Sequence, residues 1–331
     1  KMEIIENTTE FWLEVGGAGT VAAKKDADAG ICQAGTAVAI GKFDGIHKGH
    51  AALLSHILKQ KEKGRKAVVF TFYPSASVFF GGGGTAEITT RQEKRKMFEK
   101  LGIDILIEFP LNAQTAATPP GEFVKKYLSE QMHTAYLAAG ADVTFGYKGQ
   151  GNKELLIKLA DNYGYQVQII DKLYYGDREI SSTFVREEVE KGDMPMAERL
   201  LGRYYSFEGR VEEGSRLGRK LGMPTLNLYP EKEKLLPPKG VYYSRVLLEG
   251  ETYAGITNIG RKPTVNDTDA VDVETYLYDF DRNVYGREIV TELLQFKRPE
   301  QRFAGVEELK AQMERDIAEG RAFRAKCQVP F

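Results

Sequence analysis

The sequence predicts an α/β domain with a parallel sheet, followed by a mainly antiparallel β-barrel or sandwich with a terminal helix. Two observations lead to this fold class. Strand-like and helix-like segments alternate up to about residue 190, which is typical of a parallel sheet covered by helices. Beyond Gly202, short strand-like segments follow one another between turn residues, which is typical of antiparallel sheets. The length of 331 residues favours two domains, which we place at residues 1–190 and 191–331.

The elements of the first half follow from the hydrophobic pattern. Residues 36–40 are apolar and β-branched, as in a buried parallel strand, and a helical apolar spacing follows through residues 53–58. We expect further strands at residues 66–72, 104–109, 136–143 and 165–170, and further helices at residues 91–101, 121–131 and 153–162.

The second half begins with a helical stretch at residues 182–201, interrupted near Gly192 and Pro195, that would connect the domains. An amphipathic helix at residues 306–319 would pack against the barrel or sandwich. The expected strands are residues 205–211, 240–248, 252–258, 272–278 and 289–296.

Composition narrows the classes of function. Lys plus Arg number 46 and Asp plus Glu 47, whereas a nucleic-acid-binding protein normally carries a basic face. The start of the chain lacks the apolar core of a signal peptide, and no segment approaches the ~20 apolar residues that span a bilayer. Cys32 and Cys327 give no disulfide framework. We therefore expect a soluble cytoplasmic protein that binds neither nucleic acid nor membranes.

Residues 36–50 carry the most informative pattern. An apolar run ends at Gly41, Gly45 allows a tight turn, and His47 and His50 open the next helix. Residues at i and i+3 share one helix face, and the N–H groups at a helix start attract phosphate. The pattern therefore predicts an anion site. For the two histidines alone, metal ligation or an ordinary place at a helix start stays open.

Together the strand, the GxFDGxHxGH turn and the helix resemble the HxGH signature of the nucleotidylyltransferase superfamily. In full they resemble the adenylyltransferase half of bacterial bifunctional riboflavin kinase/FAD synthetases. This resemblance implies a Rossmann-like first domain in which His47 and His50 are catalytic and stabilise the α-phosphate without a covalent intermediate. It also implies nucleotide-binding roles for Gly41, Phe43, Asp44 and Gly45.

Residues 181–186 form a second notable segment, in which three hydroxyl residues are followed by an arginine about one helical turn later. An N-cap and a surface arginine would explain it, but the same groups suit a triphosphate. The segment resembles the ISSTxxR signature of the same superfamily, although Phe184 stands where the family usually has an arginine. The resemblance implies that Ser181, Ser182, Thr183 and Arg186 bind the nucleotide.

Residues 140–152 resemble the GxDFRFGxxxxGD segment of the family. The resemblance implies flavin-binding roles for Asp142 and Phe145. Thr144 and Asn152 replace the arginine and the second aspartate of that segment, and we expect these departures to change flavin contacts more than the type of reaction. The alternative is that these residues are a strand followed by a glycine-rich loop that binds no ligand.

Residues 209–228 resemble the riboflavin kinase signature GxVxxGxxxGxxLGxPTxN. Thr225 and Asn227, at i and i+2, point to one side of an extended segment, and their oxygens suit Mg²⁺. A basic hairpin loop that lies in solvent would explain the same segment without a functional role for Thr225 and Asn227. The resemblance implies that Thr225 and Asn227 bind the metal and that Gly214, Gly218 and Gly222 bind the nucleotide.

Glu274 is expected on a strand, where an acidic side chain is often simply solvated. The resemblance instead makes Glu274 the base that takes the proton from the ribityl 5′-hydroxyl of riboflavin. It also implies flavin-binding roles for Asn258 and Arg298.

The resemblance extends from about Gly41 to Asp316 and implies a bifunctional enzyme of FAD biosynthesis. Riboflavin would be phosphorylated by ATP to FMN, and AMP from a second ATP would then pass to FMN, releasing pyrophosphate. The implied cofactor is Mg²⁺, and the implied partners are the small molecules ATP, riboflavin and FMN. Two alternatives remain open: an adenylyltransferase for another phosphate-bearing acceptor, and a flavin sensor that has kept the fold without catalysis.

Overall fold

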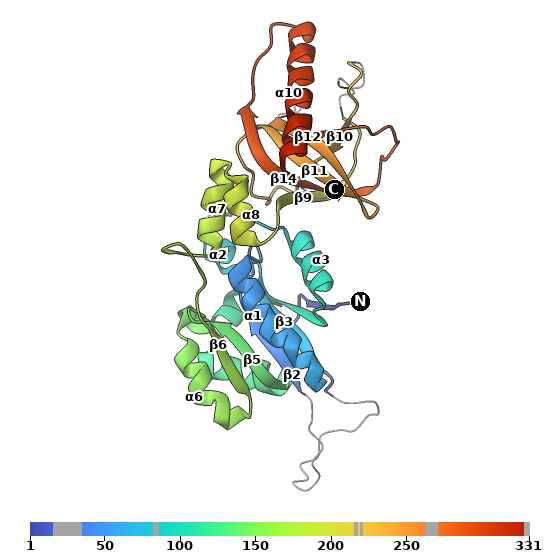
Figure 1. The fold of residues 1–331 in the computed structure, drawn as a ribbon. Helices are drawn as coiled ribbons and strands as arrows, with labels where there is room; N and C mark the ends of the chain where they lie inside the picture. The colour runs from blue at the N-terminus through green and yellow to red at the C-terminus, as the bar shows by residue number, and fades with distance from the viewer. Residues whose placement is uncertain (16–34, 82–85, 215–217, 219–220, 262–270, 328–331) are drawn as a thin grey trace. The chain divides into compact units, whose positions relative to one another are not determined.

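The computed structural model describes residues 1–15, 35–81, 86–214, 218, 221–261 and 271–327 (Figure 1). The chain divides into two compact units. Unit 1 consists of Lys1–Thr85 and Arg91–Ser181, and unit 2 consists of Ala86–Thr90 and Ser182–Phe331. Within the described ranges, no helix combines the length and the apolar character that crossing a bilayer requires.

Unit 1 is built on a six-stranded parallel sheet with the strand order β1-β4-β3-β2-β5-β6. The direction of winding reverses at β2, because β3 lies on one side of it and β5 on the other. In open α/β sheets, ligands bind beyond the carboxyl ends of the strands at such a reversal. The strands are β1 (Glu3–Glu6), β2 (Thr36–Ile40), β3 (Lys66–Tyr73), β4 (Ile105–Pro110), β5 (Thr134–Gly140) and β6 (Gln166–Ile170).

Helices cover both faces of this sheet, because successive side chains of a strand point to opposite faces. Ala37 and Ala39 of β2 share a core cluster with residues of α1 (Lys48–Lys59) and α3 (Arg91–Leu101). Val38 and Ile40 share another with residues of η2 (Val124–Gln131) and α6 (Lys153–Tyr163). Shorter elements are η1 (Gln60–Lys63), α2 (Ala76–Phe79), α4 (Ala113–Ala116), α5 (Pro120–Phe123), η3 (Tyr147–Gly149), β7 (Tyr174–Tyr175) and β8 (Arg178–Glu179).

Unit 2 is an antiparallel barrel preceded by two helices. Its six strands follow the order β10-β13-β12-β11-β14-β9. The two end strands meet where the Glu212 N–H donates to the Asn227 carbonyl at 2.9 Å, and this bridge closes the sheet. The elements are α7 (Ser182–Lys191), α8 (Met194–Leu201), β9 (Tyr205–Arg210), β10 (Thr225–Leu228), β11 (Gly240–Leu248), β12 (Glu251–Arg261), β13 (Val271–Leu277), β14 (Glu288–Pro299) and α10 (Val306–Cys327).

The terminal helix α10 runs along the outside of the barrel (Figure 1). Its Ile317 packs against the cluster of Val241, Ala254 and Ile256 on the outer face of β11 and β12. The Tyr243 ring stacks on the ring of Phe323, with centroids 4.3 Å apart. The outer face of the barrel is therefore partly covered by apolar side chains of this helix.

The predicted fold class is confirmed, and the sheet is a barrel rather than a sandwich. Residues 141–143 were wrongly included in a strand, because the Val143 N–H donates to the Gly140 carbonyl at 3.1 Å and turns the chain away. The predicted helix at residues 121–131 is α5 followed by a π-helix, and the terminal helix continues to Cys327. Cys32 lies outside the described residues.

Candidate functional site

A strained turn leads from the carboxyl end of β2 into α1. Gly45 has a φ of 82°, and Phe43 and Ile46 also have positive φ values of 51° and 38°. Both non-glycine side chains are buried, so their packing offsets the unfavourable backbone conformation. The turn ends at His47, the N-cap residue of α1. It lies beyond the carboxyl end of β2, where the sheet reverses its winding.

His47 and His50 form a stacked pair at the start of α1. Their ring centroids lie 3.8 Å apart with an interplanar angle of 26°, and the Phe43 ring lies 5.2 Å from that of His50. A Cβ on Gly49 would lie 3.1 Å from the His47 ring, so the glycine makes room for this arrangement. The two imidazoles are thus held together where the helix N–H groups favour an anion.

The second nucleotide signature begins beside the first. A Cβ on Gly49 would lie 3.6 Å from the Ile180 carbonyl oxygen, which places the residue before Ser181 against the start of α1. In unit 2, α7 begins at Ser182, and the Arg186 guanidinium donates to the Ala86 carbonyl. Ser182 is half-buried and Thr183 is exposed.

Phe184, the departure from the superfamily pattern, is a packing residue. Its side chain is only 7% exposed on the buried side of α7. Because a position so enclosed suits an apolar ring better than a cation, the burial accounts for phenylalanine here.

The two flavin candidates of unit 1 differ in their surroundings. Asp142 is exposed just beyond β5, and the Lys172 ammonium lies 3.5 Å from it and 2.8 Å from Glu179. The hydrogen bond to Glu179 and the negative charge of Asp142 raise the pKa of Lys172. In contrast, the Phe145 side chain is 3% exposed and packs against Phe123, with centroids 5.3 Å apart.

Phe145 therefore shapes its loop from within the core. It pairs with Gly151, where a Cβ would lie 2.5 Å from the ring. The next residue, Asn152, caps α6 by accepting a hydrogen bond from the Leu155 N–H at 3.0 Å. Replacing the family's aspartate by asparagine thus preserves a helix cap.

Four predicted residues of unit 2 lie in one row across the barrel. Asn227 on β10 is opposite Glu274 on β13, which is opposite Asn258 on β12. The row continues through Val241 on β11 to Arg298 on β14. Residues directly opposite in antiparallel strands point to the same face. The barrel thus brings together side chains that are widely separated in the sequence.

Thr225 lies two residues before Asn227, on the same side of β10, and it forms a polar cluster with Asn227 and Glu274. The Thr225 hydroxyl donates to the Glu274 carboxylate at 2.8 Å. A Cβ on Gly214 would lie 2.3 Å from Oδ1 of Asn227, and one on Gly218 would lie 3.4 Å from Oγ1 of Thr225. Gly214 and Gly218 therefore let the backbone at these two positions lie directly against the candidate metal ligands. Gly222 has a φ of 78° and faces open space, so its role is in the turn.

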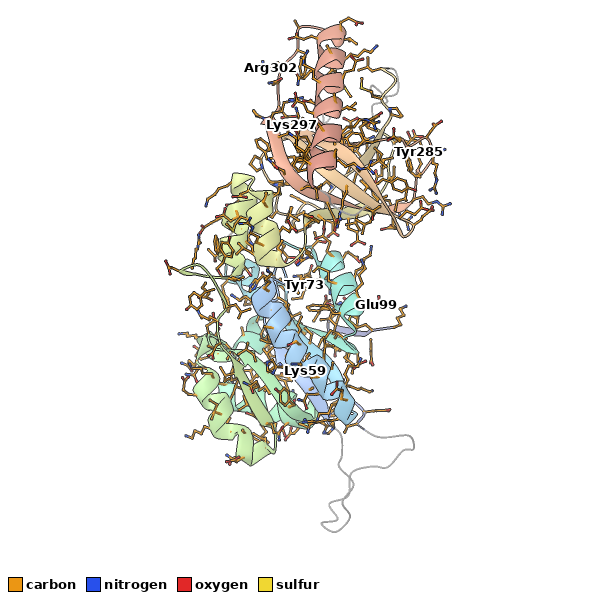
Figure 2. The ribbon with its side chains drawn as sticks, viewed as in Figure 1. Lys59, Tyr73, Glu99, Tyr285, Lys297 and Arg302 are labelled. Carbon is orange, nitrogen blue, oxygen red and sulfur yellow. The ribbon has the colours of Figure 1, made fainter. Side chains whose placement is uncertain are left out.

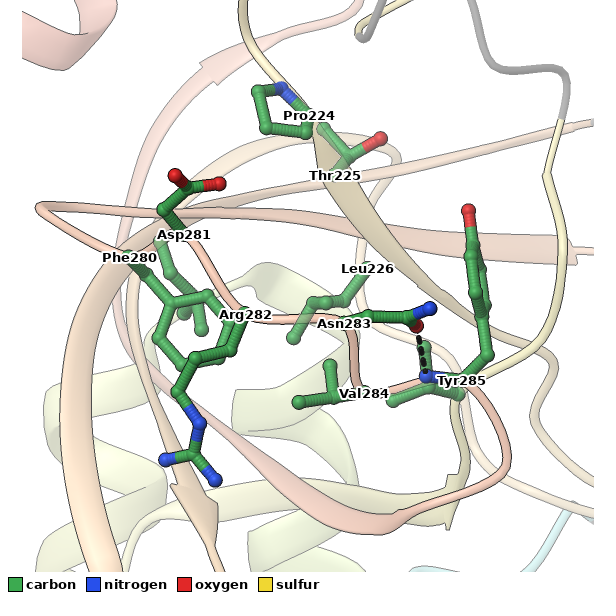
Figure 3. Close-up of a pocket in the computed structure, with 11 residues that line it drawn as sticks. Pro224, Thr225, Leu226, Phe280, Asp281, Arg282, Asn283, Val284 and Tyr285 are labelled. Atoms are coloured by element: carbon green, nitrogen blue, oxygen red, sulfur yellow. Dashed lines mark hydrogen bonds between the residues drawn. The ribbon is translucent and has the colours of Figure 1, made fainter.

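A cavity of about 390 Å³ adjoins Thr225 (Figure 3). The loop between β13 and β14 forms much of its wall, and Asn283 Oδ1 accepts a 3.2 Å hydrogen bond from the Tyr285 N–H in this loop. This loop was not predictable from the sequence, because its residues match none of the motifs described above. The lining residues are Val211, Pro224, Thr225, Leu226, Leu277, Phe280, Asp281, Arg282, Asn283, Val284 and Tyr285.

Arg298 is engaged by a carboxylate of α10. Its Nη2 lies 2.6 Å from Oδ2 of Asp316, and the Lys297 ammonium, labelled in Figure 2, lies 2.7 Å from Oδ1. Burial alone would raise the pKa of Asp316, but hydrogen bonds from Arg298, Lys297 and Gln312 outweigh it and lower that pKa. Arg298 therefore joins the end of the row to α10.

Both halves of the chain match family models. Residues 31–184 match the model described as FAD synthetase, and residues 201–324 match the model described as riboflavin kinase. A bifunctional riboflavin kinase/FMN adenylyltransferase of Listeria monocytogenes is 36% identical over 294 residues, which cover 88% of this chain and 93% of the relative. The enzyme of the same name from Escherichia coli is 36% identical over 297 residues, with coverage of 88% and 93%.

A solved structure supports the same architecture. The Streptococcus pneumoniae protein described as a macrolide-efflux protein superposes with a TM-score of 0.75 at 28% identity. The match covers 87% of this chain and 94% of that protein. The two-domain fold is therefore found in a solved structure over almost its full length.

Proposed function

The chain belongs to the family of bifunctional riboflavin kinase/FMN adenylyltransferases, and from this premise we propose which of its side chains carry the two reactions. The enzyme phosphorylates riboflavin with ATP to form FMN, and it transfers AMP from ATP to FMN to form FAD and pyrophosphate. Both steps are displacements at phosphorus, in which positioning and charge stabilisation dominate. The row through Glu274 is the observation that carries our assignment.

Glu274 acts as the general base of the kinase reaction. It takes the proton of the riboflavin 5′-hydroxyl while the hydroxyl oxygen attacks the γ-phosphorus of ATP, and ADP leaves. The support for this role is that the carboxylate is half-buried and oriented by the Thr225 hydroxyl. Asn258, the next residue in the row, and Arg298 at its end are the groups that we assign to the flavin side.

Thr225 and Asn227 fit a magnesium ion. Within the described part of the chain, Oδ1 of Asn227 is buried and has no hydrogen-bond partner, and Gly214 places no side chain over it. Hydroxyl and amide oxygens are hard ligands of the kind that Mg²⁺ accepts. The ion would neutralise negative charge on the phosphates of ATP. The described residues contain no group of three or more His, Cys, Asp and Glu side chains that could form another metal site.

The cavity beside Thr225 holds the nucleoside of ATP in the kinase reaction. Its position next to a candidate metal ligand supports this assignment, because the phosphates must reach that ligand. The Phe280 ring offers an apolar surface, and the Arg282 guanidinium lies 5.8 Å from its centroid. Gly214, Gly218 and Gly222 belong to the loop that we assign to the phosphates.

AMP transfer depends on the turn at the carboxyl end of β2. A phosphate oxygen of FMN attacks the α-phosphorus of ATP, and pyrophosphate leaves. His47 and His50 stabilise the charge on the α-phosphate, and the backbone of residues 41–45 binds the nucleotide, as do residues 181–183 and Arg186. Asp142 lies at the carboxyl end of the neighbouring strand β5 and is assigned to the flavin, whereas Phe145 supports its loop.

The functional boundary at residues 190 and 191 is part of the proposal, and it lies at the end of α7. We also place the enzyme in the cytoplasm, where ATP is available to both reactions. The near balance of 46 basic and 47 acidic residues supports small-molecule substrates rather than nucleic acid.

A time course on the purified chain tests the assignments. Riboflavin, ATP and Mg²⁺ are supplied, and FMN, FAD and pyrophosphate are measured. FMN should appear before FAD, with pyrophosphate equal to FAD. A chelator should abolish FMN formation, and FMN formation that persists without any divalent ion would contradict the roles of Thr225 and Asn227.

A further inference from the structure

Five residues from the first half of the chain belong to unit 2. Ala86–Thr90 interrupts unit 1 in the sequence, between α2 and α3, and packs within unit 2. Ile88, Thr89 and Thr90 are buried. We call residues 86–90 the strap. The strap thus belongs to the unit that contains the kinase barrel.

The strap pairs with the segment that follows β10. The Glu87 N–H donates to the Glu233 carbonyl at 2.5 Å, and the Leu235 N–H donates to the Glu87 carbonyl at 2.7 Å. The Thr90 hydroxyl donates to the Glu231 carboxylate at 3.2 Å. Residues 231–235 belong to the segment between β10 and β11, so the strap is attached to a connection of the kinase barrel.

Lys234 fixes the middle of the strap. Its side chain is 3% exposed, and its ammonium donates to the Ile88 carbonyl at 3.0 Å. The same ammonium lies 4.7 Å from the centroid of the Tyr205 ring. A buried cation is costly unless it has partners, so a lysine enclosed in this way strongly favours the docked position of the strap.

The other end of the strap contacts the second nucleotide signature. The Arg186 guanidinium donates to the Ala86 carbonyl, two residues before the carbonyl that Lys234 binds. Arg186 thereby has a fixed backbone partner in the strap. A continuous chain of contacts leads from Lys234 through residues 86–88 to Arg186.

We propose that Lys234, a residue of the kinase barrel, is a positioning residue for AMP transfer. It holds the strap so that the Ala86 carbonyl fixes the Arg186 guanidinium, the group that we assign to the triphosphate of ATP. This inference rests on the proposed nucleotide-binding role of Arg186. It predicts that a substitution in the kinase barrel impairs FAD formation while it spares FMN formation.

Lys234→Met tests this inference, because it keeps the length of the side chain and removes the donor. Both reactions are measured separately, with riboflavin or with FMN as the substrate. We expect the KM for ATP in AMP transfer to rise about tenfold, the effect of losing one charge-assisted hydrogen bond. The KM for ATP and the kcat in the kinase reaction should stay within about twofold of the original values. Lys232→Met, an exposed neighbour, is the matched control and should change neither reaction.

Arg186→Ala separates failure of the inference from failure of the proposed function. If Arg186→Ala weakens AMP transfer and Lys234→Met does not, the inference is wrong and the role of Arg186 stands. If Arg186→Ala leaves AMP transfer unchanged, that role and the inference both fall. In the Arg186→Ala background, Lys234→Met should have no further effect on the KM for ATP, and an additive effect would contradict the coupling.

Thr90→Val covers the case in which Lys234→Met also loses kinase activity through misfolding. It removes only the hydroxyl that donates to Glu231. AMP transfer should then show a raised KM for ATP of about threefold, at the low end of what one hydrogen bond contributes, because Glu231 is exposed. FMN formation should be retained. No change in AMP transfer with Thr90→Val would overturn the inference.

Discussion

The Thr225 hydroxyl donates a 2.8 Å hydrogen bond to the Glu274 carboxylate across β10 and β13. This bond orients the carboxylate beside Asn227, its direct partner in the register of the two strands. The proposed base and the two proposed oxygen ligands are therefore arranged on one face before any substrate binds. Preorganisation of this kind is what a displacement at phosphorus requires.

Glu274→Gln should reduce FMN formation by about 10²–10⁴-fold, the usual contribution of a general base. The amide keeps an oxygen that can accept from Thr225, so the barrel should remain folded and riboflavin binding should persist. The measurement is FMN formation from riboflavin, with FAD formation from supplied FMN as the internal control. A wild-type rate of FMN formation would make Glu274 an ordinary surface residue.

Gly214→Ala should disturb the candidate metal site without adding a polar group. The new Cβ would lie 2.3 Å from Oδ1 of Asn227, so the amide must move. Because a misplacement of about 1 Å can cost about 100-fold in rate, we expect a loss of that order in kinase activity and a higher Mg²⁺ requirement.

Gly305→Ala is the matched control for this substitution, since a Cβ there meets nothing within 4 Å. It should leave FMN formation unchanged. Equal kinase activity of the two alanine variants would show that the absence of a side chain at Gly214 is not needed for the position of the Asn227 amide.

Asp316→Asn should lower the thermal stability of the barrel at neutral pH. Asp316 is buried between Arg298 and Lys297, and removing one partner of a buried ion pair costs about 3–5 kcal/mol. The lowered pKa of Asp316 means that its stabilisation is complete above the unfolded value of about 3.9 and is lost as the pH falls through the folded value. The Tm difference between the two proteins, measured from pH 7 to pH 3, should therefore shrink below about pH 4. A constant difference would show that the charge of Asp316 is not the cause.

Phe184→Arg should not improve FAD synthesis, although it restores the residue usual in the superfamily. The buried side chain of Phe184 leaves no place for a cation without repacking α7. We expect a Tm lower by several degrees and FAD formation no faster than in the unchanged protein. Faster FAD formation would instead show that this position reaches the nucleotide.

Regular elements with a clear period were predictable from the sequence. The bounds of β2, α3 and β11 agree with the predicted residues 36–40, 91–101 and 240–248. Each has a strong apolar pattern that the tertiary structure reinforces. β1 was missed, because four residues with glutamate at both ends show no such pattern, and only its pairing with β4 makes them a strand.

The residues of the proposed kinase site were predictable only as separate motifs. Thr225, Asn227 and Glu274 were identified by resemblance, but their adjacency depends on the pairing of β10 with β13, which joins segments almost fifty positions apart. The strap was out of reach for the same reason. Its partners at residues 231–235 lie far along the chain. The local sequence around Lys234 does not indicate that this lysine is buried and binds a distant carbonyl.

The most direct test of two independent centres in one chain is a mixing experiment with His50→Ala and Glu274→Gln. Loss of one transition-state donor typically costs about 10²–10³-fold, so His50→Ala given riboflavin, ATP and Mg²⁺ should accumulate FMN with little FAD. Glu274→Gln alone should form little of either product from riboflavin. Because FMN is a diffusible product, the mixture of both proteins should restore FAD formation. A mixture that stays inactive, with each folded variant having lost both reactions, would contradict the assignment of the two activities to separate residues.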